Sequence, residues 1–66
     1  MNVNKLKGKI VENGMTIEGL AARIGLDRAT LYRKLGNFEK VTIGEAVKIK
    51  EVLTLTNEDA CDIFLS

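Results

Sequence analysis

Two arginines on one short segment are the residues of this chain best suited to bind a ligand. Arg28 and Arg33 lie in segment 28–35, where Leu31 and Leu35 are four residues apart. That spacing is typical of a helix with one apolar side against a core. A guanidinium carries its hydrogen-bond donors in one plane, so it can donate to the O6 and N7 atoms of one guanine at the same time. Segment 28–35 is therefore the candidate recognition element.

The helical wheel of segment 28–35 gives it an outer face. With the two leucines turned inward, three residues at steps of four project outward: Ala29, Arg33 and Asn37. The methyl group of Ala29 can contact a thymine C5-methyl, and Thr30 on one flank can serve a phosphate or a thymine. Tyr32 lies on the other flank. Its role stays open between packing on a neighbouring element, stacking at a DNA backbone and contacting a partner.

A second short helix is expected just before Gly25. Thr16 is a good N-cap for it, and an apolar face follows at 3–4 spacing: Ile17, Leu20, Ala21 and Ile24. Gly25 suits a sharp turn with positive φ, Leu26 closes the turn from inside, and Asp27 can cap the next helix. Two helices joined in this way can place the second in the major groove of DNA.

Three further helices are expected from the same periodicity and cap signals. They cover residues 3–13, 42–53 and 56–65. Thr42 and Glu45 are spaced for a capping box, and Asp59 is placed to close a similar box with Thr56. Gly14 and Gly36 fit helix stops, with Phe38 packing behind the latter. The inner face of the fourth helix is predicted to hold Ile43, Ala46, Ile49 and Leu53.

The fold class predicted from these elements is all-α. No segment alternates between apolar and polar residues with the period of a strand, and no repeat or linker divides the chain. We therefore expect a single domain over residues 1–66, built as a compact bundle of five short helices.

Composition excludes several classes of function. The chain has no histidine and one cysteine, which excludes common zinc frameworks and histidine-based triads. We therefore expect no enzyme, no metal and no cofactor, and interpret Cys61 as a small buried hydrophobe. No apolar run approaches the ~18 residues of a membrane span, and the N-terminus lacks the features of a signal peptide. Cytoplasmic residence without a membrane partner follows as the expectation.

The net charge of +1 conceals a dipolar molecule. Residues 1–40 carry a net charge of +4, whereas residues 41–66 carry −3. A phosphate backbone would favour the basic half, so the acidic half is expected to lie away from it. Which of Lys5, Lys7 and Lys9 faces DNA is left open.

The turn residues also resemble a known family. The pattern Leu20-Ala21-x-x-Ile24-Gly25-Leu26, with Leu31 following, resembles the helix-turn-helix of the lambda-repressor and Cro group of bacterial and phage regulators. The tail Glu-Asp-Ala-x-x-Ile-Phe is similar to small phage-encoded members. The resemblance covers nearly the whole chain. It implies a five-helix lambda-repressor-like domain that binds an operator and regulates transcription, as a phage or prophage repressor or Cro-like protein does.

The resemblance also assigns roles to residues of the third helix. It implies that the base-reading positions are Arg28, Ala29 and Arg33, and that Asn37 and Lys40 grip the backbone. From the helix dipole, the amides at Thr16 and Ile17 are expected to face a phosphate, with Lys34 a weaker candidate. The family often has Ser or Thr where Asp27 stands, so its carboxylate must be engaged by the cap to be tolerated near phosphates.

The apolar C-terminus leaves two arrangements open. Ile63, Phe64 and Leu65 can fold onto the chain's own core or pair two copies. A weak homodimer formed mainly on DNA would match a palindromic operator with half-sites ~34 Å apart. The alternative function is a protein-interaction module of the same fold that binds or sequesters another regulator. No small-molecule ligand is expected in either case.

Overall fold

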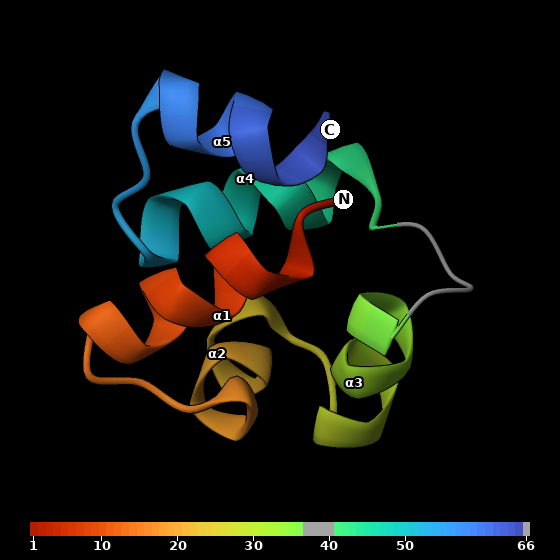
Figure 1. The fold of residues 1–66 in the computed structure, drawn as a ribbon. Coiled ribbons are helices and arrows are strands. Elements are labelled where there is room, and N and C mark those ends of the chain that lie inside the picture. The colour runs from red at the N-terminus through yellow and green to blue at the C-terminus, as the bar shows by residue number, and fades with distance from the viewer. Residues whose placement is uncertain (37–40, 66) are drawn as a thin grey trace.

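The computed structural model describes residues 1–36 and 41–65 and contains five helices within them (Figure 1). Those residues form no strand, and the predicted all-α fold is confirmed. The helices are α1 (Val3–Glu12), α2 (Ile17–Ile24), α3 (Arg28–Gly36), α4 (Ile43–Val52) and α5 (Asn57–Phe64). No helix among the described residues is long and apolar enough to cross a membrane.

Side-chain caps fix where the helices begin. Thr16 Oγ1 accepts the N–H of Gly19 at 3.0 Å at the start of α2. At the start of α4 the expected capping box is complete, since Thr42 Oγ1 accepts the N–H of Glu45 at 3.1 Å and Glu45 Oε1 accepts that of Thr42 at 2.9 Å. Each cap satisfies amides that the helix itself leaves unpaired.

The cap of α5 differs from the box predicted for it. Thr56 Oγ1 accepts the N–H of Asp59 at 3.0 Å, as expected. The carboxylate of Asp59, however, is directed toward Lys5 and Lys9 of α1. Two ammonium groups attract a carboxylate more strongly than one neutral amide does, so the long-range ion pairs replace the local bond.

Three helices are followed by a residue with left-handed backbone, which is a glycine after two of them and a threonine after the third. Gly14 and Gly25 have φ of 68° and 81°, as the turn assignments require. α3 ends at Gly36 as predicted, but Gly36 is its last helical residue and does not have a left-handed backbone; Phe38 lies outside the described residues. After α4, Thr54 takes a φ of 54° although it carries a branched side chain.

The core lies between all five helices. α2 packs against α3 and α4, while α1 packs against α5. The most deeply buried large side chains come from all five helices and from the C-cap of α4: Leu6, Leu20, Leu31, Ile49, Leu53 and Ile63. Full burial of each stabilises the fold by about 1.5–3 kcal/mol. This shared core holds α3 at one corner of the molecule, beside α2 (Figure 1).

Candidate nucleic-acid interface

The outer face of α3 is open to solvent. Leu31 and Leu35 are buried, and Thr30 is half-buried. Arg28, Ala29, Tyr32 and Arg33 are all exposed. Leu31 and Leu35 thus lie inward and Ala29 and Arg33 outward, as the helical wheel predicts, whereas Asn37 lies outside the described residues.

The turn between α2 and α3 is closed by backbone bonds to a single carbonyl. The N–H groups of Gly25 and Leu26 both donate to the carbonyl oxygen of Ala21, the latter at 2.9 Å. Ala21 is buried together with Leu20 and Ile24, and Leu26 packs against the same core. A small residue at 21 and a left-handed residue at 25 thus bring the two helices together at a fixed angle.

Asp27 is engaged as the cap of α3. Its Oδ1 accepts the N–H of Thr30 at 3.1 Å, and its carbonyl accepts that of Leu31. Hydrogen bonds from the hydroxyl and the amide of Thr30 hold the pKa of Asp27 below its usual value. The negative charge therefore faces the positive end of the α3 dipole. The cap thus engages the carboxylate, as is required of an acidic residue close to phosphates.

The start of α2 and the outer face of α3 form one continuous surface. A shallow hollow between them is lined by Thr16, Ile17, Glu18, Arg28 and Tyr32. Because the first amides of a helix point beyond its N-terminus, a phosphate lying across this hollow would meet the positive end of α2. Of the three expected base readers, the structure places Arg28 beside the expected phosphate position, together with the carboxylate of Glu18.

Lys34 is held by α4. Its Nζ lies 3.3 Å from Glu45 Oε1, and its side chain is only 14% exposed. The backbone N–H of Thr42 and the charge of Lys34 together outweigh burial and lower the pKa of Glu45. This pair joins the last turn of α3 to the start of α4. The two other expected backbone contacts, Asn37 and Lys40, lie outside the described residues.

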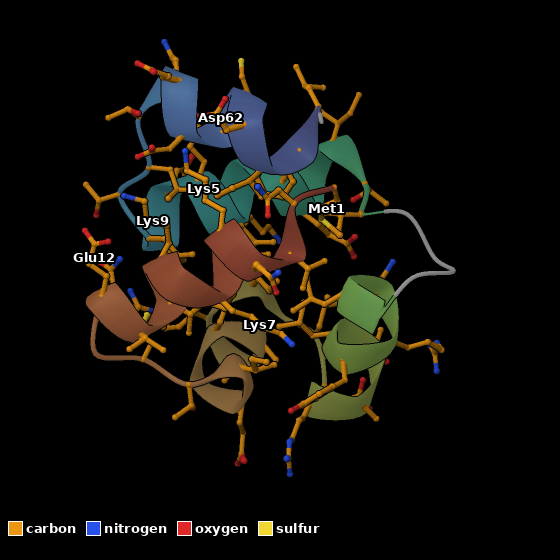
Figure 2. All side chains as sticks on the ribbon, in the orientation of Figure 1. Met1, Lys5, Lys7, Lys9, Glu12 and Asp62 are labelled. Atoms are coloured by element: carbon orange, nitrogen blue, oxygen red, sulfur yellow. The ribbon has the colours of Figure 1, made fainter. Side chains whose placement is uncertain are left out.

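An ionic cluster that the sequence analysis missed joins α1 to α5. Lys5 Nζ lies 2.7 Å from Asp62 Oδ2 and 3.4 Å from Asp59 Oδ1, and Lys9 Nζ lies 3.4 Å from Asp59 Oδ2. The hydrogen bond to Asp62 raises the pKa of Lys5. Lys7 lies on the other side of α1, toward α2 and α3 (Figure 2). Only the spacing of Lys5 and Lys9 on one helix face could have suggested the cluster.

Asp59 is the centre of this cluster. Partial burial disfavours its charge, but the ammonium groups of Lys9 and Lys5 outweigh that effect and lower its pKa. Two of the three α1 lysines are therefore neutralised by the acidic C-terminal half.

An apolar groove of about 950 Å³ lies along α4 and α5 and reaches the last turn of α3. Ile43 and Leu65 beside it are 85% and 80% exposed, and Val47 is 48% exposed. The prediction that Ile43 faces the core is therefore wrong. Cys61 lines the groove and is exposed, contrary to its interpretation as a buried residue.

The C-terminal residues divide between core and surface. Ile63 has no exposed surface, because it packs inside with α1, so the prediction that it contacts a second copy is wrong. Phe64, which is half-buried, and Leu65, which is exposed, both line the groove. The surface available to a second copy is therefore built from α4 and the end of α5.

With this geometry, the chain is a helix-turn-helix protein whose second motif helix presents a polar, basic face. Residues 5–64 match the family model of the Cro/C1-type HTH DNA-binding domain, and the chain belongs to that family. A search of curated proteins and a search of solved structures each found no match. The family is that of DNA-binding domains, which confirms the resemblance stated from the sequence.

Proposed function

We propose that this protein is a sequence-specific transcriptional regulator, a phage or prophage repressor or Cro-like protein that inserts α3 into the major groove of its operator. One observation carries the proposal: in a Cro/C1-type domain, Arg28 and Arg33 stand exposed on a helix that Leu31 and Leu35 fix to the core. Bound there, in the bacterial cytoplasm, the protein would block polymerase without enzymatic chemistry.

The contacts divide into base reading and phosphate anchoring. Arg28 and Arg33 each bond a guanine, and Ala29 lies against a thymine methyl group. Each bidentate arginine contact discriminates against a wrong base by about 1–3 kcal/mol. The N-terminus of α2, at Thr16 and Ile17, anchors a phosphate. Thr30, Tyr32 and Asp27 flank these contacts. Asn37 and Lys40 bind the DNA backbone.

A second copy binds through the apolar face formed by Ile43, Val47, Phe64 and Leu65. The described part of the molecule measures 27 × 26 × 20 Å, so two copies side by side can place their reading helices about one turn of DNA, ~34 Å, apart. The resulting two-fold symmetry requires a palindromic operator. The dimer is weak alone and forms mainly on DNA.

The test is selection from random duplex DNA with the purified protein, followed by binding of the enriched pool at two salt concentrations. A palindromic consensus with steep salt dependence supports the regulator and the dimer, whereas a single half-site supports the regulator alone. Arg33→Ala should lose the preference at one base position with an unchanged melting temperature. Enrichment of no sequence would refute the proposal.

A protein-interaction module is the second candidate, and the exposed Ile43 and Leu65 favour it. Such a module would bind or sequester another regulator through the apolar face. Its affinity for that partner would change little with salt, because burial of apolar surface is not screened by ions. Weak DNA binding that vanishes at physiological salt would favour this function.

A further inference from the structure

We propose that Tyr32 is a positioning residue for base recognition: the face of its ring holds the Arg28 guanidinium at the start of α3 before DNA arrives. This inference rests on the proposed function. The carbon at the centre of the Arg28 guanidinium lies 5.5 Å from the centroid of the Tyr32 ring. That distance is within the range, about 6 Å, at which the ring quadrupole attracts a cation.

The helix itself produces this contact. Arg28 and Tyr32 are four residues apart on α3, so their side chains lie one above the other on the helix surface. Both are exposed, and both line the hollow next to the first residues of α2. The ring therefore keeps the guanidinium beside the start of α2, on the surface assigned to DNA.

Arg28 needs such support more than Arg33 does. It stands in the first turn of α3, and on the wheel it lies nearer the inward side than Ala29 or Arg33. A long arginine side chain loses rotamer freedom when it forms a two-bond contact, and a fork that is already held in place loses less. Tyr32 thus supplies orientation to Arg28, while Arg33 projects directly from the outer face.

The interaction uses the ring face and leaves the hydroxyl group unused. This distinguishes the proposal from a direct contact in which the Tyr32 hydroxyl donates to a phosphate. Tyr32→Phe keeps the ring and removes the hydroxyl, whereas Tyr32→Ala removes both. Tyr32 is 49% exposed and lies outside the buried core, so neither substitution should lower the melting temperature appreciably.

The experiment uses the duplex enriched by the wild-type protein and single-base variants of it. Dissociation constants are measured for the wild type, Tyr32→Phe, Tyr32→Ala, Arg28→Ala and the double variant with alanine at both positions. Tyr32→Phe should match the wild type. Tyr32→Ala should lose discrimination by about 2- to 5-fold, the ratio that corresponds to an exposed cation–π contact, and only at the base that Arg28→Ala affects. The double variant should be no worse than Arg28→Ala.

Three results would overturn the role of Tyr32. Equal losses for Tyr32→Phe and Tyr32→Ala would show a hydroxyl contact with DNA. Unchanged or tighter binding by Tyr32→Ala would show that the ring does not assist Arg28, and equal losses at all bases would show that Tyr32 acts on DNA directly. A wild type with no sequence preference would instead refute the proposed function, and this role with it.

The free protein offers a readout that needs no DNA. The ring current of Tyr32 should shift the NMR signals of the Arg28 side chain. The shift should persist in Tyr32→Phe and disappear in Tyr32→Ala. Signals at random-coil positions in the wild type would overturn the proposal.

Discussion

Thr54 is the site at which one substitution should make the protein more stable. It follows α4 with a φ of 54°, a left-handed conformation that crowds the branched Cβ against the backbone. The N–H of Leu55 donates to the carbonyl of Lys50 at 2.9 Å, and this bond closes the turn around Thr54. The side chain of Thr54 is exposed, so its removal costs no core contact.

The expected gain from Thr54→Gly is the difference of two terms. A left-handed backbone costs a residue other than glycine about 1–2 kcal/mol. Glycine loses more conformational entropy on folding than threonine does, and this loss offsets about 0.5–1 kcal/mol of the stabilisation. With the middle of each range, about 1.5 less about 0.75 kcal/mol, the free energy of unfolding should rise by about 0.75 kcal/mol. That gain raises the melting temperature of a domain of this size by about 3–6 °C.

Thermal and urea unfolding followed by circular dichroism measure this change. Gly25→Ala is the matched control, because Gly25 has a φ of 81° and an added Cβ would meet no atom within 4 Å. That variant should be destabilised by about 1 kcal/mol through backbone conformation alone. A Thr54→Gly variant that melts at or below the wild-type temperature would refute the reasoning.

Three further predictions concern the core, the carboxylates and the apolar face. Leu31→Ala should lower the free energy of unfolding by about 2–5 kcal/mol in urea titrations, since Leu31 has no exposed surface; a loss below about 1 kcal/mol would contradict its place in the core. Folding lowers the pKa of three carboxyl groups, so their stabilisation is present above the unfolded pKa values near 4 and is lost as pH falls through the lower folded values. Melting temperatures should accordingly fall below about pH 4, and a fall that begins at pH 6 would contradict these pKa directions. The groups are Asp27, Glu45 and Asp59. Leu65→Lys should weaken cooperative binding to a palindrome but leave single half-site binding unchanged in gel-shift titrations; equal weakening of both would argue against a dimer contact at α5.

Local signals in the sequence predicted most of what positions α3. The caps at Thr16, Asp27 and Thr42 and the left-handed turn at Gly25 depend on residues within four positions of one another. Such interactions can be deduced from spacing, because the helix fixes which neighbours meet. The inward leucines of α3 followed from the same geometry.

The features that sequence reasoning missed depend on contacts between distant segments. Lys5 and Asp62 are joined only after α1 and α5 have packed together. Ile43 precedes Ile49 by six residues, which is about 240° around the helix. Its side chain therefore does not lie on the face of α4 that packs against the core. The left-handed Thr54 likewise follows from the way α4 is joined to α5, against its local preference.

The measurement that tests the central claim most directly is an NMR titration of the labelled protein with its selected duplex. The account predicts that the largest amide shift changes occur at the start of α2 and at Arg28, Ala29 and Arg33. Changes confined to α4 and α5, with the outer face of α3 unaffected, would contradict it.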